Sequence, residues 1–423
     1  MNHESSAPAE STSVIGDFFK FIVYSFRLVI RGSWAYYAWI AALLVMMTVG
    51  AAAYAYQFQQ GLIVTAMRDQ MMWGLYIGNF TFLVGVAAAA VVLVIPAYIY
   101  DWGPIKEIVL IGEILAICSL IMCLMFIGVD IGRPDRLWHP LPFLGYLNFP
   151  SSVMAWDMIV LNIYLVVNFT VASHIVYRSF RGLHPVKSFV VPLVLFSIPM
   201  AVSIHTVTAF LYNGLPGRPY WNASILAPRF LASAFCSGPA IILLLLQVLR
   251  KTTGLKIKDQ AIWKIAELMA YAMFINLFLL VSEVFREFYS NTHHVIHFQY
   301  LFFGVDGHNA LVWYAWLSVG LSVVAFFLFL VPATRKNPVT LNIGCVMIYL
   351  GVYLEKGLCL IVPGLTPDTL GEIYEYLPSD VEFAVAAGIY SFGFLLFTLM
   401  IKVAINVAMV DLQLETGSVA AEA

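Results

Sequence analysis

Long apolar runs, separated by shorter polar connections, follow one another along almost the whole chain. Each run has about 20 residues or more, the length that an α-helix needs to cross roughly 30 Å of hydrocarbon at 1.5 Å per residue. The pattern therefore predicts an all-α integral membrane protein with about ten transmembrane helices. We place these spans at approximately residues 34–58, 73–100, 106–129, 153–178, 188–212, 224–249, 263–288, 309–332, 338–361 and 384–408.

The two ends of the chain do not follow this pattern. The first residues are polar, and residues 18–31 mix Phe and Leu with Lys20, Arg27 and Arg31, which is typical of a helix lying on a membrane surface. We expect three segments: a polar N-terminus with this interfacial helix at 1–33, a membrane domain at 34–410 and a tail at 411–423.

Composition supports the membrane assignment and excludes one class of partner. Apolar residues make up 61% of the chain and charged residues 11%, against about 45–50% and about 25% in soluble domains. A net charge of −2 without a basic cluster excludes nucleic-acid binding. The five cysteines lie singly in apolar segments, so we interpret them as packed hydrophobic residues and expect no metal site.

Basic residues are distributed unevenly between the two sets of connections. The connections on the side of the termini carry 14 Lys and Arg, and those on the opposite side carry five. The positive-inside rule then places both termini in the cytoplasm of a bacterial or archaeal cell. The long connections 130–152, 289–308 and 362–383 would face outward, and the last is rich in Asp and Glu. Long connections often carry binding sites.

The first of these outward connections has the densest polar sequence, at 129–157. Asp157 lies just inside the fourth span, where a carboxylate costs about 2.5–3.5 kcal/mol and usually faces a cavity or a partner. Paired with Asp157, the imidazole of His139 could exchange a proton with a ligand oxygen near neutral pH. The alternative is structural, with Asp157 capping its own helix.

Four ordered motifs in this region match a known family. They are GRPDRLWHP followed by SSVMAWD, SIHTVTAFLY in the fifth span, PYWNASILAPRFLASAFCSGPA, and SEVFREFYS. From about residue 70 to 360 the chain resembles the NrfD family, also called the polysulfide reductase membrane-subunit family. It is most similar to the ten-span branch found in the Qrc menaquinone reductase, alternative complex III and DsrMKJOP complexes.

The resemblance implies both architecture and function. It implies two four-helix bundles, spans two to five (about 73–212) and six to nine (about 224–361), with spans one and ten flanking them. It also implies a subunit of a quinone oxidoreductase with no independent activity, no haem or iron–sulfur cluster of its own, and menaquinone as its quinone. Its partners would be a periplasmic iron–sulfur subunit, with a multihaem cytochrome c or a molybdopterin-type subunit. The family's quinone-site histidine and aspartate match His139 and Asp157.

Further residues are candidates by position. The quinone ring would be lined by loop residues near His139 and by the histidine of the fifth-span motif: Arg133, Trp138, Phe143, Tyr146, Trp156 and His205. Charged residues within spans could conduct protons from the cytoplasm to this pocket: Glu113, His174, Glu267 and Glu283. For Glu267 and Lys356 the alternative is snorkelling to an interface, and for His205 it is a hydrogen bond to a neighbouring helix.

Three other functions stay open at this point. A di-haem cytochrome b would need two histidines at one depth, and His174 and His205 fall at different depths. A secondary transporter is compatible with ten spans and with helices interrupted by Pro or Gly. A passive anchor for extrinsic proteins would bind no quinone at all.

Overall fold

The computed structural model describes residues 14–409 apart from 101, 107 and 142. The expected tail at 411–423, and the polar residues that precede residue 14, lie outside the described residues. Within them the chain is helical, with one isolated β-bridge between Val305 and His308.

Ten helical segments of the described chain are long and apolar enough to cross a membrane, which confirms the predicted number. They are α2 (Trp34–Gln60), α3 with α4 and η2 (Leu75–Ala87, Ala89–Val94, Ile95–Ile99), α6 (Val109–Asp130), α7 (Val153–Phe180), α8 (Lys187–Asn213), α9 (Leu226–Thr253), α10 (Asp259–Ser290), α12 (Val312–Leu330), α14 with α15 (Pro338–Lys356, Leu358–Leu365) and α16 with η4 (Asp380–Ala404, Ile405–Met409). The shorter helices are α1 (Val14–Ile30), η1 (Leu62–Val64), α5 (Gly103–Lys106), η3 (Pro134–Arg136), α11 (Val295–Phe302) and α13 (Pro332–Lys336).

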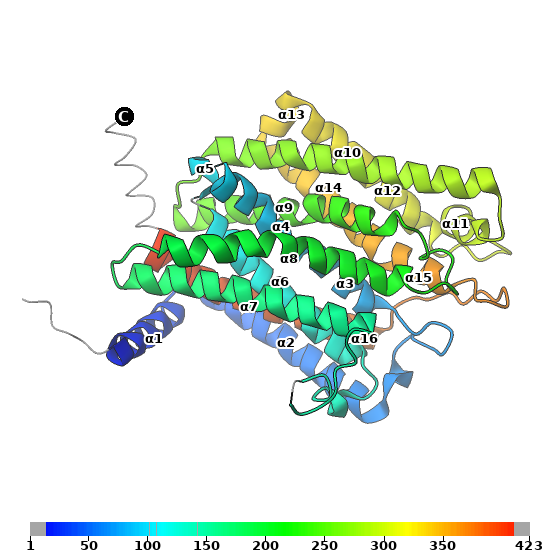
Figure 1. Ribbon diagram of the computed structural model, residues 1–423, viewed down its shortest axis with the longest axis horizontal. Helices are drawn as coiled ribbons and strands as arrows, with labels where there is room; N and C mark the ends of the chain where they lie inside the picture. The colour runs from blue at the N-terminus through cyan, green and yellow to red at the C-terminus, as the bar shows by residue number, and fades with distance from the viewer. Residues whose placement is uncertain (1–13, 101, 107, 142, 410–423) are drawn as a thin grey trace, which may run out of the picture.

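The long helices form two four-helix bundles and a flanking pair, as expected. The first bundle consists of α3 with α4, α6, α7 and α8, and the second of α9, α10, α12 and α14. The bundles meet where α3 and α8 pack against α9. The helix α2 pairs with α16, and α16 packs against α6. We call the end that holds α1 and η4 the terminal end and the opposite end, which holds α11, α15 and the connection 131–152, the loop end (Figure 1).

Two predicted spans are not single straight helices. The segment 75–99 is interrupted at Ala88 and ends in a π-helical turn that contains Pro96, which has no amide hydrogen to donate to the helix. The segment 338–365 breaks at Gly357, directly after Glu355 and Lys356. Hydropathy shows the length of each apolar run but not these breaks.

The helix α1 is held at the terminal end by the last turn of α7. Its Asp17 pairs with Arg181 at 3.4 Å, and the ring of Phe21 packs edge-on against those of Tyr177 and Phe180. Other apolar side chains of α1, such as Phe19, stay exposed. This arrangement suits a helix lying along a membrane surface, which remains a prediction.

At the loop end, the side chain of Glu382 is buried rather than part of an exposed acidic surface. It forms a capping box with Ser379 at the start of α16, accepts a hydrogen bond from the Ala66 amide at 2.8 Å, and accepts another from the Tyr376 hydroxyl. That hydroxyl also accepts from the Leu75 amide at 2.7 Å. Burial and the Glu382 charge raise the pKa of Tyr376, which keeps the phenol a donor. Glu382 thereby joins α16 to the start of α3.

The flanking pair depends on close contact between two glycines. A Cβ atom on Gly388 of α16 would lie 2.8 Å from the Cα of Gly50 in α2. Small residues allow such close approach of membrane helices. We predict that Gly388→Leu destabilises the protein by about 1–3 kcal/mol through overpacking, measured as a lower thermal midpoint in detergent. Gly320→Leu in α12, where a Cβ would meet nothing within 4 Å, is the matched control. Equal shifts in both variants would contradict the prediction.

Candidate functional site

Asp157 faces the interior of the first bundle and does not cap its own helix. The cap of α7 is Ser152, whose Oγ accepts a hydrogen bond from the Ala155 amide. Asp157 lies about one turn further along α7, is 3% exposed, and accepts a hydrogen bond of 2.7 Å from the Thr208 Oγ1 on α8. The structural alternative considered for Asp157 is therefore wrong, and the carboxylate is a buried polar group between two helices.

The fifth-span motif places three polar side chains on one face of α8. His205, Thr208 and Tyr212 are three and four residues apart, the spacing of one helical face. The Tyr212 hydroxyl lies 2.5 Å from the Thr81 hydroxyl of α3. His205 is 1% exposed and donates from Nδ1 to the Ala201 carbonyl at 2.7 Å, while its Nε2 has no hydrogen-bond partner in the described chain. This buried stripe joins α8 to α7 and α3.

The connection 131–152 is a series of tight turns that exposes most of its aromatic residues. The His139 ring lies 4.0 Å from the Trp138 ring, and both are exposed. Tyr146 is 81% exposed, and Phe143 is fully exposed with φ of 69°, an uncommon value for a bulky residue. Gly145 is required because a Cβ there would lie 1.9 Å from the His139 carbonyl oxygen.

The other two predicted quinone-lining residues have local partners. Arg133 forms a two-pronged hydrogen bond with the Asp135 carboxylate at 3.0 and 2.9 Å, and this bond lowers the pKa of Asp135. Trp156 donates to the Pro150 carbonyl at 2.7 Å. Within the described residues no hydrogen bond joins His139 to Asp157, since the His139 ring is exposed in the loop whereas Asp157 is 3% exposed inside the bundle. The structure thus places these residues in one loop and the adjoining turn of α7.

The predicted proton-pathway residues differ in their surroundings. Glu113 on α6 is 2% exposed, and its Oε2 atom has no partner in the described chain. His174 accepts from the Val186 amide at 3.3 Å, beside the turn between α7 and α8. His205 lies about 27 Å from that turn along α8 at 1.5 Å per residue, so the two histidines cannot share a haem.

Glu267 is engaged near the terminal end. Its carboxylate lies 3.5 Å from the Lys264 ammonium and 3.9 Å from the Arg335 guanidinium, and it accepts a hydrogen bond from Tyr271. Three partners at a partly exposed position indicate a structural ion-pair network.

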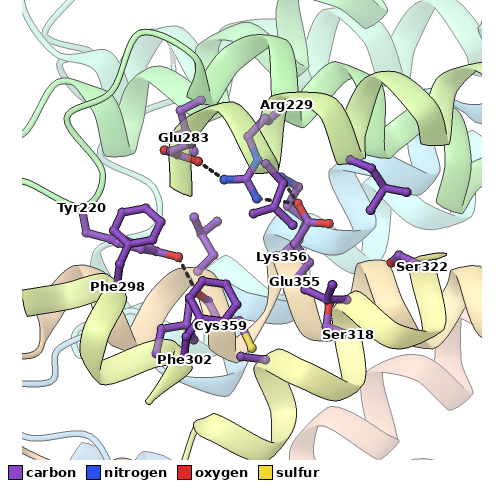
Figure 2. A pocket seen from close by; sticks show the side chains of 17 residues that line it. Tyr220, Arg229, Glu283, Phe298, Phe302, Ser318, Ser322, Glu355, Lys356 and Cys359 are labelled. Carbon is purple, nitrogen blue, oxygen red and sulfur yellow. Dashed lines mark hydrogen bonds and ion pairs between the residues drawn. The ribbon is translucent and has the colours of Figure 1, made fainter. Parts of the chain in front are cut away.

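Glu283 belongs to a buried charge cluster in the second bundle. Arg229 of α9 pairs with Glu283 of α10 and, at 2.8 Å, with Glu355 of α14 (Figure 2). Glu355 also lies 3.1 Å from the Lys356 ammonium and accepts from Asn276 at 2.9 Å. These charges are nine-tenths or more buried. The two cations and two carboxylates neutralise each other and join three helices.

Lys356 does not snorkel to an interface. It is 4% exposed, and its ammonium lies 4.7 Å from the centroid of the Phe230 ring. A cavity of about 30 Å³ adjoins the cluster, with Ser318 and Ser322 on its wall, which is room for one or two water molecules. The Lys356 ammonium thus belongs to the buried charge cluster of the second bundle.

Sequence reasoning missed Arg229 and Thr208. Arg229 follows a proline in the motif around residues 219–240, and an arginine about four residues inside an apolar span is itself a signal of a buried partner. Thr208 gives no such signal, since threonines are common in membrane helices.

Comparison with known proteins gives the family. The family model described as polysulphide reductase, NrfD matches residues 63–367, and the chain belongs to this family. Several relatives match over most of their lengths, among them the following three. A protein of Halobacterium salinarum, named as a membrane subunit of dimethyl sulfoxide reductase, is 26% identical, over 85% of this chain and 88% of its own.

The other two relatives carry quinone-related names. The Hdr-like menaquinol oxidoreductase integral membrane subunit of Archaeoglobus fulgidus is 21% identical, over 89% of this chain and 95% of its own. The menaquinone reductase integral membrane subunit of Nitratidesulfovibrio vulgaris is 23% identical, over 85% of this chain and 89% of its own. This chain is thus a multi-span integral membrane protein of the NrfD family.

We predict that Arg229→Met destabilises the protein by about 3–5 kcal/mol, because two buried carboxylates then face a single lysine. Adding Glu283→Gln restores a neutral cluster and should recover most of the loss. Thermal unfolding of the purified protein in detergent measures both effects. Arg133→Met, which removes an exposed pair, should change the midpoint little. Additive losses in the double variant would contradict this account.

Proposed function

We propose that this chain is the quinone-interacting membrane subunit of a respiratory oxidoreductase complex. The single observation that supports it most is the buried Asp157 carboxylate. It lies near the start of α7, directly after the His139 loop, and accepts a hydrogen bond from Thr208 of α8. Family membership and the names of the menaquinone reductase and menaquinol oxidoreductase relatives support the same interpretation.

In this proposal the loop end binds the quinone, with menaquinone as the substrate. Interconversion of a quinone and its quinol moves two electrons and two protons. Asp157 and His139 exchange those protons with the two quinone oxygens, and a buried carboxylate bonded to a hydroxyl is suited to that role. The quinone ring is lined by five residues of the loop and the adjoining turn of α7: Arg133, Trp138, Phe143, Tyr146 and Trp156. His205 lies deeper, along α8.

The electrons come from an extrinsic partner. Trp138, Phe143 and Tyr146 expose large aromatic surfaces at the loop end, and such residues are enriched where proteins associate. We propose that this loop is covered by an iron–sulfur protein, together with a multihaem cytochrome c or a molybdopterin-type protein. The excess of basic residues at the terminal end supports an orientation with both termini in the cytoplasm and the partner on the periplasmic side.

Protons for the quinone enter from the terminal end. Glu113 lies near that end of α6, and one of its carboxylate oxygens has no partner among the described residues. The helix α6 packs against α7, which carries both His174 and Asp157. Glu283 and its cluster offer a second polar path in the other bundle. Electrons from one side and protons from the other would make turnover generate a membrane potential.

We predict that Asp157→Asn lowers quinone-dependent turnover at least tenfold while the complex still assembles. The amide keeps the size of the side chain and the hydrogen bond but cannot carry the proton. The measurement is quinone reduction or quinol oxidation by the purified complex, with its protein composition checked on the same sample. Asp306→Asn, an exposed carboxylate at the same end, is the control. Wild-type turnover by an assembled Asp157→Asn complex would favour a passive anchor instead.

A second prediction tests the proton path. Glu113→Gln should lower both turnover and potential formation in sealed vesicles by about tenfold, because the amide blocks proton uptake at the start of the path. Glu267→Gln should have little effect, since its ion pairs indicate a structural role. A potential-sensitive dye, read with and without an ionophore, measures the result. A normal potential in Glu113→Gln would exclude entry through this residue.

A further inference from the structure

A second cavity, distant from the charge cluster, opens at the terminal end of the second bundle. It has a volume of about 470 Å³ and lies between the last turn of α9 and the first turns of α10 and α14. Its lining is Gln247, Arg250, Lys251, Asp259, Ile262, Trp263, Lys336, Pro338 and Leu341. A single water molecule occupies about 30 Å³ of liquid, so the cavity is large enough for a polar group of many atoms.

The charges around this cavity are unbalanced. Arg250 is neutralised by Asp259, with the two side chains 2.5 Å apart. Lys251 and Lys336 form no ion pair with a carboxylate in the described chain, and the Lys336 ammonium instead lies 5.2 Å from the centroid of the Trp263 ring. The cavity therefore carries a net charge of about +2.

The remaining walls are apolar or already hydrogen-bonded. Ile262, Trp263, Pro338 and Leu341 present apolar surface. The Gln247 amide is paired reciprocally with the Asn342 amide of α14, so it needs no further partner. A ligand that fits must bring negative charge to the lysines and apolar surface to the rest of the cavity.

We propose that this cavity binds the headgroup of an anionic phospholipid. The phosphate would lie between Lys251 and Lys336, and the glycerol and upper acyl chains would lie along Trp263 and Leu341. Basic pockets between membrane helices bind anionic lipid headgroups in this way, and Trp residues lie at the headgroup level of membranes. The first turns of α10 and α14, whose dipoles favour negative charge, add to the attraction. A lipid bound here connects three helices of the second bundle, away from the proposed quinone site.

The test compares two double variants of the complex purified from its own membranes. Lys251→Gln with Lys336→Gln removes the cavity's charge, and Lys20→Gln with Lys187→Gln removes two exposed lysines at the same end that do not line it. The probe is phosphatidylglycerol in nanodiscs, with phosphatidylcholine as the neutral reference. Lipid retention is measured by native mass spectrometry, and stabilisation by the thermal midpoint.

We expect the cavity variant to bind phosphatidylglycerol about 30-fold more weakly, since one lysine near anionic lipid contributes roughly a fivefold factor. The control variant and phosphatidylcholine retention should not change. Equal phosphatidylglycerol retention by both double variants would overturn the proposal. So would protection by inorganic phosphate alone, which would indicate a free-anion site. Loss of an extrinsic protein with unchanged lipid retention would also overturn it, because the cavity would then bind an acidic protein segment.

Discussion

The bilayer core has no water to solvate a charge, and the internal arrangement of this protein follows from that constraint. Four charged side chains of the second bundle, Arg229, Glu283, Glu355 and Lys356, would cost about 10–14 kcal/mol if each entered the membrane alone, at roughly 2.5–3.5 kcal/mol apiece. That sum is comparable to the whole stability of a typical protein, about 5–15 kcal/mol. The charges must therefore neutralise one another, and doing so fixes how α9, α10 and α14 pack. The break at Gly357 in the ninth span follows directly after two of these residues.

The first bundle meets the same constraint differently. Of its buried carboxylates, Asp157 is matched by the hydroxyl of Thr208, whereas Glu113 has one oxygen without a partner among the described residues. The same face of α8 also carries His205, whose Nε2 has no partner in that part of the chain. The ionised form of a carboxylate is stabilised less by a neutral hydrogen-bond donor than by neighbouring cations, because hydrogen bonds between charged groups are stronger. This difference separates the two sites chemically. This difference is why we propose proton exchange with a ligand in the first bundle, whereas the second holds a buried salt-bridge cluster next to a small cavity.

The two ends of the molecule are also unlike. At the loop end the exposed groups include the aromatic side chains of the connection 131–152, and the buried Glu382 links α16 to the start of α3. At the terminal end the connections are rich in lysines and arginines, and α1 lies beside the end of α7 with several apolar side chains exposed (Figure 1). This contrast is why we propose a protein partner at the first end and an anionic lipid at the second. The assignment of the two ends to the two sides of a membrane rests on this same charge asymmetry.

The sequence alone determined the membrane class, the number of spans and the positions of most charged residues along them, because apolar length is a local property of the chain. It also singled out Asp157 and His205, since any polar group in an apolar run stands out. It could not decide what those groups contact. Hydropathy gives a residue's depth in the membrane but not the direction in which its side chain points around the helix axis, so Lys356 could equally have snorkelled or been buried. The pairing of Arg229 with Glu283 and Glu355 joins positions 54 and 126 residues apart. Only the packing of three helices brings them together, which is why the tertiary structure, and not the sequence, decided where the buried charges meet.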